Sequence, residues 1–237
     1  MPGISNLALR DVAMKPFWLD RRDAPLALPP LETNSKADLL VVGGGFTGLW
    51  GAIQSRQACP DRDVILIEKD EIATGASGRP GGVVSTSVMH GLSNALRIFP
   101  RDIAELERLG KENIAGMMAT IEQFGIDCHA EWGGELTVAV DSAHIEALRL
   151  EHQLHLRYGH NSVFLDEAAV QAEIRSPRYK AAVWSKDASG TVHPALLAWG
   201  LKRAAIELGV RVFEHTELVS LIDQGDRITA MTARGSV

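Results

Sequence analysis

Three glycines near residue 45 have a spacing that lets a turn of the backbone bind a phosphate group. Gly43, Gly45 and Gly48 form a G-x-G-x-x-G pattern, and Glu68 follows about 25 positions after the first glycine. In such a turn the first glycine permits a tight bend, the second lets the backbone approach a pyrophosphate, and the third allows close packing. A carboxylate at the position of Glu68 can accept hydrogen bonds from ribose hydroxyls. These four residues predict a site for a dinucleotide.

Short apolar runs on both sides of the glycines supply the elements that such a site needs. Residues 39–42 predict a buried parallel strand, residues 46–57 predict a helix, and residues 64–67 predict a second strand that ends at the acid. Strand, glycine turn, helix and strand make a βαβ unit, and the start of its helix favours phosphate charge. The candidate site also takes in the neighbours of the turn and of the acid, Phe46, Thr47 and Lys69.

The glycines and the acid leave the identity of the dinucleotide open. NAD and FAD use the same βαβ unit, so both remain candidates at this point. The carboxylate of Glu68 disfavours NADP, because it stands where a 2′-phosphate would have to lie. The next segment, residues 73–87, is rich in glycine, serine and alanine and predicts a loop. A flexible linker is one interpretation of this loop, and a part of the cofactor site is the other.

The loop carries a second motif, Ala-Thr-Gly-Ala-Ser-Gly-Arg-Pro-Gly-Gly at residues 73–82. It resembles the second flavin motif of the D-amino-acid oxidase-like (DAO) family of FAD-dependent oxidoreductases, in which G-A-S-G-R-N-G-G follows the acid-tipped strand. The resemblance implies that the loop runs along the pyrophosphate toward the flavin ring, and it favours FAD over NAD. Arg79 can offset phosphate charge there, and glycines let backbone lie against a flat ring. The matching residues are Ser77, Gly78, Arg79, Gly81 and Gly82.

Further segments resemble the same family, in particular its gamma-glutamylputrescine oxidoreductase type. Residues 17–20 resemble the lead-in of this amine-oxidoreductase branch, and residues 191–194 resemble the segment that returns to the cofactor domain. By this likeness residues 211–223 give a backbone contact to the adenosine side, assigned here to Leu218. The likeness covers most of residues 15–237 and implies the N-terminal portion of a family member, with a fold incomplete at the C-terminus.

Three positions depart from the family pattern. Pro80 stands where Asn is usual, which removes a side-chain amide and a backbone donor near the flavin. His193 stands where Asp or Asn is usual. Arg79 occupies the place where some relatives carry a flavin-linking histidine, so the resemblance implies non-covalent FAD.

Composition excludes several other classes of function. The net charge is 24 − 30 = −6, with no basic stripe, so nucleic acid and anionic membranes are not expected partners. Two cysteines, Cys59 and Cys128, make neither a disulfide framework nor a zinc site, and an intracellular, cytoplasmic protein is expected. No apolar run approaches the roughly 20 residues that span a bilayer. His152, His155 and His160 lack the pattern of a metal motif, and no metal site is expected.

The expected fold class is α/β (α+β overall): a Rossmann-type FAD-binding βαβ unit with part of a substrate domain. The predicted divisions are a tail at 1–37, the cofactor unit and flavin loop at 38–90, a partial substrate domain at 91–190, and a return segment at 191–237. Phe17 and Trp18 either pack back onto the body or belong to a disordered tail. Periodicity and caps predict further helices at 102–124, 141–158, after Asp166 and from Pro194 to Gly209, and strands at 135–140, 181–185, 210–213, 218–222 and 227–232.

The leading hypothesis is FAD-dependent oxidation of a small-molecule amine or amino acid. By the resemblance, hydride passes from the substrate carbon that bears nitrogen to the flavin, and the imine then hydrolyses. No catalytic base is assigned, because the family's substrate-side residues lie largely beyond this chain. The alternatives are a non-catalytic FAD- or nucleotide-binding remnant or split subunit, and an NAD-dependent dehydrogenase. An incomplete sheet edge would also favour association with a partner.

Overall fold

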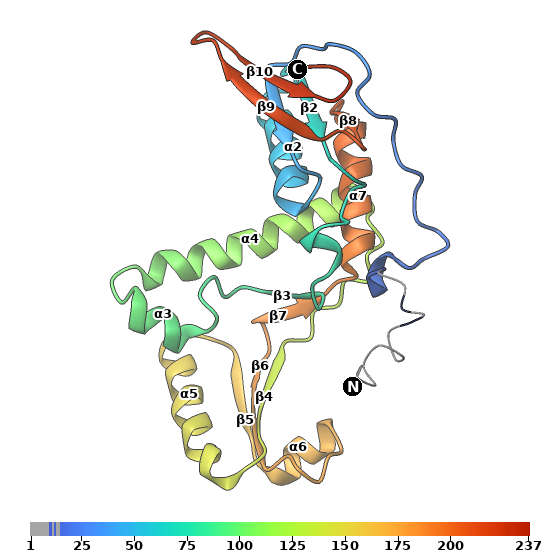
Figure 1. Ribbon diagram of the computed structural model, residues 1–237. Coiled ribbons are helices and arrows are strands. Elements are labelled where there is room, and N and C mark those ends of the chain that lie inside the picture. Colours follow the sequence, from blue (N-terminus) through green and yellow to red (C-terminus); the bar gives the residue numbers. More distant parts are fainter. Residues whose placement is uncertain (1–9, 11, 13–14) are drawn as a thin grey trace, which may run out of the picture. The chain divides into compact units, whose positions relative to one another are not determined.

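The computed structural model describes Arg10, Val12 and residues 15–237, and these residues form two compact units (Figure 1). Unit 1 combines the described residues up to Gly81 with Pro194–Val237. Unit 2 consists of Gly82–His193. Within the described residues, no helix combines the length and the apolar character that crossing a membrane requires.

Unit 1 is built on a three-stranded parallel sheet with the strand order β1-β2-β8. The strands are β1 (Leu39–Val42), β2 (Val64–Ile67) and β8 (Arg211–Phe213). Every residue of β2 is buried, which is the environment that its unbroken apolar run predicts. The sheet confirms the predicted βαβ unit and adds a third strand that comes from the far end of the chain.

Two helices accompany this sheet and pack against each other, α2 (Phe46–Ala58) and α7 (Pro194–Glu207). Helix α2 connects β1 to β2 and contacts both strands. In α7 the buried residues Leu197, Leu201 and Ala204 recur at helical spacing. The helix ends where Gly209 adopts a φ of 86°. Both helices therefore follow their sequence predictions closely.

A hairpin of β9 (Leu218–Asp223) and β10 (Ile228–Thr232) completes unit 1. Its tip contains Gly225, which has a φ of 88° and whose N–H donates to Asp223 Oδ1 over 2.8 Å. The predicted hairpin around residues 224–226 is thus confirmed.

The segment before β1 differs from the tail that was expected. Leu31 is only 2% exposed, and its N–H donates to Thr216 Oγ1 over 2.9 Å. A short 3-10 helix, η1 (Phe17–Leu19), places Trp18 so that its indole N–H donates to the Pro80 carbonyl, while Phe17 stays exposed. Residues 15–37 are therefore tied to unit 1, and residues 1–9, 11, 13 and 14 of the expected tail lie outside the described residues.

Unit 2 contains a three-stranded antiparallel sheet, a two-stranded ribbon and four α-helices among its described residues. The sheet has the order β4-β6-β5, and β3 pairs with β7 in the ribbon. The strands are β3 (Val83–Ser85), β4 (Glu135–Ala139), β5 (Ser162–Leu165), β6 (Ala181–Ser185) and β7 (Ser189–Thr191). The helices are α3 (Leu92–Ile98), α4 (Ile103–Gln123), α5 (Ile145–Arg157) and α6 (Glu167–Glu173).

Several elements depart from the sequence predictions, one of them in unit 1 and the others in unit 2. The expected loop at 73–87 contains the 3-10 helix η2 (Ala76–Gly78) and β3. Strand β3 exists because it pairs with β7, whose register places Val83 opposite Thr191, and such a distant partner leaves no local signal. Asp141 caps only the 3-10 turn η3 (Ser142–His144), which precedes α5, while Asp166 caps α6 as predicted. Helix α3 and the strands β5 and β7 were not foreseen.

Candidate functional site: the glycine turn of unit 1

The turn between β1 and α2 has a geometry that requires glycine at two of its positions. Gly43 adopts a φ of 102°, which L side chains rarely tolerate, and its N–H donates to the Ile67 carbonyl of β2 over 2.8 Å. A Cβ added at Gly48 would lie 2.0 Å from the Gly43 carbonyl oxygen. This oxygen belongs to the backbone and cannot move away without distorting the turn. The first and third glycines of the pattern thus bring helix and strand together at the turn, as the sequence predicted.

The middle of the turn is closed by the acid at the end of β2. Glu68 Oε2 accepts the Gly44 N–H over 2.6 Å, and its Oε1 accepts the Asp70 N–H over 3.0 Å. An ionised carboxylate has about four acceptor positions, so Glu68 can still accept ribose hydroxyls. The structure therefore gives Glu68 a task in shaping the turn that the sequence did not reveal.

The predicted flavin loop returns to the same turn through Ser77. Its Oγ accepts the Phe46 N–H over 2.9 Å, at the first residue of α2. A Cβ added at Gly45 would lie 3.0 Å from this oxygen, so the serine and the second glycine fit closely together. The structure thus brings the loop motif and the glycine motif into one place, although 31 positions separate Phe46 from Ser77.

The start of α2 fits the pyrophosphate of a dinucleotide. The N–H groups of Thr47 and Gly48 have no partner within the helix by helix geometry, so they can donate to an anion. The first turn of α2 carries no acidic residue that would repel the anion. A Cβ at Gly43 would meet no atom within 4 Å, so the turn is open beside its backbone. Residues 43–48, Glu68 and Ser77 together suit the cofactor that the sequence implies.

The remaining predicted site residues make no hydrogen bond to the glycine turn among the contacts described for them. Arg79 is exposed, its Nε donates to the Thr74 carbonyl over 3.1 Å, and it lines a cavity of about 540 Å³ with Lys15, Asp70 and His215. The Cβ position of Gly81 is open, Lys69 is exposed, and Leu218 is half-buried at the start of β9. Gly82 belongs to unit 2, where it has a φ of 81° and its carbonyl accepts the Val192 N–H over 2.8 Å.

Pro80 and His193, which depart from the family pattern, both form hydrogen bonds through their backbone. The Pro80 carbonyl accepts the indole N–H of Trp18 over 2.7 Å, so this position anchors the segment that contains η1. The His193 N–H donates to the Cys128 carbonyl over 2.7 Å, and its ring meets the ring of His129 edge-on at 5.9 Å.

Unit 2 has a polar cavity of about 400 Å³ with histidines and glutamates in its lining. His160 Nε2 lies 2.8 Å from Glu107 Oε2, and the His155 and His160 rings stack at 5.2 Å. Burial lowers the pKa of the His155 imidazole, and the neighbouring histidines lower it further. Burial raises the pKa of the Glu151 carboxyl, and the charge of Glu135 adds to this rise. The described residues contain no group of three or more His, Cys, Asp or Glu side chains that could hold a metal ion.

Sequence reasoning missed three residues that shape the glycine turn. A Cβ at Gly44 would lie 2.1 Å from Ile72 Cδ1, so this isoleucine fills the space beside the second position of the motif. Glu214 and Lys202 form a buried ion pair that holds the Ile72 backbone. A glutamate one residue after a predicted strand, and a lysine among the apolar residues of a predicted helix, were the only signals.

Comparison with known proteins places this geometry in one family. Residues 38–237 match the family model described as FAD dependent oxidoreductase (DAO). The chain is 27% identical to the probable oxidoreductase OrdL of Haemophilus influenzae over 94% of this chain and 52% of the relative. It is 32% identical to the gamma-glutamylputrescine oxidoreductase of Escherichia coli over 87% of this chain and 48% of the relative. The chain thus spans about half the length of the curated relatives that it matches.

Solved structures support the same fold. Glycine oxidase from Bacillus cereus superposes with a TM-score of 0.67 at 22% identity, over 85% of this chain and 53% of that chain. Glycine oxidase from Geobacillus kaustophilus superposes with a TM-score of 0.69 at 22% identity, over 84% of this chain and 52% of that chain. The family match, residues 38–237, covers residues of both units. The chain belongs to the DAO family of FAD-dependent oxidoreductases.

Proposed function

We propose that unit 1 binds FAD non-covalently at the glycine turn and that the protein oxidises a primary or secondary amine or an amino acid. The observation that carries this proposal is the joining of the turn, the acid and the loop motif through Gly44–Glu68 and Phe46–Ser77. Bound FAD would supply the redox chemistry, by accepting a hydride from the substrate carbon that bears nitrogen.

The residues of unit 1 divide the task of binding the cofactor. The N–H groups at the start of α2 hold the pyrophosphate, and the glycines at 43 and 48 give it access. Glu68 accepts the ribose hydroxyls with the lone pairs that do not accept the N–H groups of Gly44 and Asp70. Leu218 and Lys69 flank the adenosine side, while Arg79 and Gly81 belong to the flavin side in this proposal.

The names of the relatives support a choice of substrates to test. The Escherichia coli relative is a gamma-glutamylputrescine oxidoreductase, and two structural neighbours are glycine oxidases. A linear amine that carries a γ-glutamyl group is therefore the first substrate to test, and glycine is the second.

The test is the spectrum of the purified protein before and after anaerobic addition of γ-glutamylputrescine, glycine or sarcosine. We expect FAD to co-purify and its visible band to bleach with one of these amines. Bound FAD that no amine bleaches would point instead to a non-catalytic FAD-binding subunit. Protein without flavin whose tryptophan fluorescence is quenched by NADH would refute the proposal in favour of an NAD-dependent dehydrogenase.

A further inference from the structure

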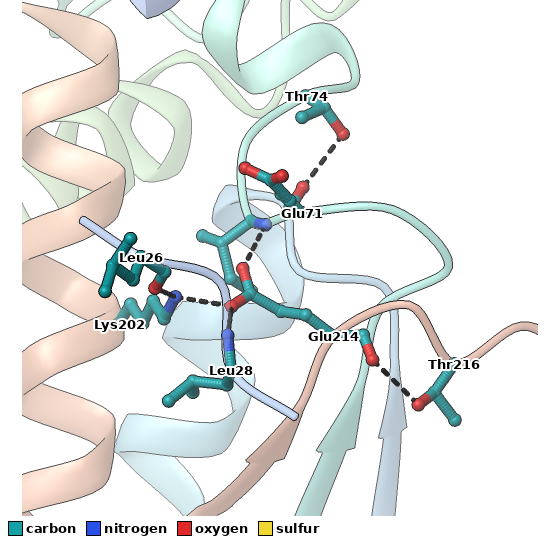
Figure 2. A network of polar contacts seen from close by, with 8 residues as sticks. Leu26, Leu28, Glu71, Thr74, Lys202, Glu214 and Thr216 are labelled. Atoms are coloured by element: carbon teal, nitrogen blue, oxygen red, sulfur yellow. Dashed lines mark hydrogen bonds and ion pairs between the residues drawn. The ribbon is translucent and has the colours of Figure 1, made fainter. Parts of the chain in front are cut away.

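A buried ion pair lies behind the loop that follows β2 in unit 1. Glu214, directly after β8, is 1% exposed, and Lys202 of α7 is 7% exposed. Their charged atoms, Glu214 Oε2 and Lys202 Nζ, are 2.5 Å apart. Figure 2 shows the glutamate reaching between α7 and two segments of backbone.

The carboxylate of Glu214 connects these segments. Its Oε1 accepts the Ile72 N–H over 2.6 Å. Its Oε2 accepts the Leu28 N–H over 2.5 Å (Figure 2). Lys202 Nζ also lies 3.4 Å from the Leu26 carbonyl oxygen. Removing both ions from water is costly, and these contacts offset that cost only while every partner is in place.

The network reaches the glycine turn through Ile72. The Ile72 side chain fills the space against Gly44, and the next residue, Ala73, donates its N–H to the Gly44 carbonyl over 3.2 Å. Ala73 has a φ of 71°, a strained value for alanine that the surrounding bonds must maintain. Displacement of Ile72 would therefore release the backbone that supports the second position of the motif.

The residues after Glu214 hold the other side of the same loop. His215 has a φ of 49° and donates its N–H to the Asp70 carbonyl over 2.8 Å. Thr216 donates its N–H to the carbonyl oxygen of Glu68 over 2.7 Å. The acid that closes the glycine turn is thus anchored by the strand end that carries Glu214.

We propose that Glu214 and Lys202 are positioning residues for FAD, which set the geometry of the glycine turn by holding Ile72 against Gly44 and the end of β8 against Glu68. This inference rests on the proposed binding of FAD at that turn. It predicts that breaking the ion pair weakens FAD binding beyond what the loss of stability of unit 1 explains.

The first experiment measures the dissociation constant of FAD for the wild type, Glu214→Gln and two controls. The Ile72 and Leu28 N–H groups donate to different carboxylate oxygens, and glutamine replaces one of these oxygens by an NH2 donor, so one N–H loses its acceptor. The substitution also leaves Lys202 without its counter-charge. Glu207→Gln removes an exposed ion-pair partner from the same helix α7. Leu201→Ala creates a core cavity and destabilises unit 1 without removing a member of the polar network. All titrations are made well below the melting temperature of each variant.

We expect the FAD dissociation constant to rise by roughly tenfold or more in Glu214→Gln. A change of this size is typical of the interaction free energy between groups in one hydrogen-bond network. Both controls should bind within about twofold of the wild type. If Leu201→Ala weakens binding as much as Glu214→Gln at equal melting temperature, the pair acts through stability alone and the proposal is overturned. Lys202→Arg, which keeps the cation, should bind better than Lys202→Met.

A second experiment needs no FAD and separates this proposal from the proposed function. Amide hydrogen exchange of Gly44, whose N–H donates to Glu68, reports whether the turn stays closed. Exchange at Gly44 should be faster in Glu214→Gln than in Leu201→Ala at matched stability. Exchange at Gly44 that is no faster in Glu214→Gln than in Leu201→Ala would overturn the positioning role. If the wild type binds no FAD but Glu214→Gln still shows the faster exchange, only the proposed function is refuted.

Discussion

Each unit of the chain contains an acid–base cluster, and the two clusters differ in how far water reaches them. In unit 1, Glu214 and Lys202 are 1% and 7% exposed, and backbone N–H groups occupy both carboxylate oxygens. In unit 2, Glu107 and His160 are 28% and 20% exposed and line a cavity of about 400 Å³. The cluster in unit 1 can hold backbone in a fixed geometry, whereas the charges of the more exposed cluster in unit 2 are more strongly screened by solvent.

The comparison also separates the roles of neighbouring charges. Glu214 has a cation and two backbone donors, so its charge is compensated. Glu151 in unit 2 lies 3.9 Å from His155 and close to the charge of Glu135, and the pKa of its carboxyl is raised. Removal of charge is therefore expected to destabilise the first cluster and to relieve the second.

The largest expected effect comes from Lys202→Met, which leaves the Glu214 carboxylate buried without a cation. The free energy of unfolding of unit 1 should fall by about 3–5 kcal/mol. Glu107→Gln in unit 2 should cost less than about 1 kcal/mol, because its pair is partly exposed and screened. Hydrogen exchange of each unit, measured as a function of denaturant concentration, gives both losses of free energy. Equal losses would show that the deeper burial of the Glu214–Lys202 pair does not make it more important for stability than the Glu107–His160 pair.

A smaller effect is expected from Ser77→Ala, which tests the hydrogen bond between the loop and the start of α2. The variant leaves the Phe46 N–H without its acceptor, so FAD affinity should fall about fivefold, or by about 1 kcal/mol. Ser93→Ala, at an exposed position of α3, is the matched control. Isothermal titration calorimetry gives the FAD dissociation constant of each variant. Identical dissociation constants for Ser77→Ala and Ser93→Ala would show that Ser77 does not contribute to FAD binding.

The smallest effect is a gain in stability from Glu151→Gln. Because the pKa of Glu151 is raised in the folded protein, its ionisation disfavours folding above that pKa. The neutral side chain should stabilise unit 2 by only about 0.5 kcal/mol at pH 7, because solvent screens the charge of a partly exposed carboxylate. The gain should vanish below about pH 4.5, where the carboxyl is protonated in both states.

Denaturant melts at pH 7 and pH 4 measure the sign of this effect, with the exposed Glu146 of the same helix as control position. A loss of stability at pH 7 in Glu151→Gln would mean that the contact with His155 outweighs the burial of charge.

The sequence was sufficient to predict the elements that depend on local patterns. The strands β1 and β2, the helices α2, α4 and α7 and the hairpin at Gly225 followed from apolar periodicity, caps and glycine. The glycine turn with Glu68 and Ser77 followed from two motifs with characteristic spacing.

The remainder depends on partners that lie far apart in the chain. Strand β3 is three residues long and exists through its pairing with β7. Ile72 and Glu214 are separated by 142 positions, and no periodicity marks the carboxylate that connects them. The segment at 28–31 was expected to be a tail because its prolines break regular structure, yet its N–H groups find side-chain acceptors in unit 1.

The most direct test of the central claim is an FAD titration of the wild type, Gly48→Ala and Gly51→Ala. A Cβ at Gly48 would lie 2.0 Å from the Gly43 carbonyl oxygen, whereas a Cβ at Gly51 on the same helix meets no atom within 4 Å. We predict stoichiometric FAD binding by the wild type and by Gly51→Ala, and a loss of about 100-fold or more, roughly 3 kcal/mol, in Gly48→Ala. Equal binding by Gly48→Ala and Gly51→Ala, or a wild type that binds no FAD, would contradict a cofactor site at this turn.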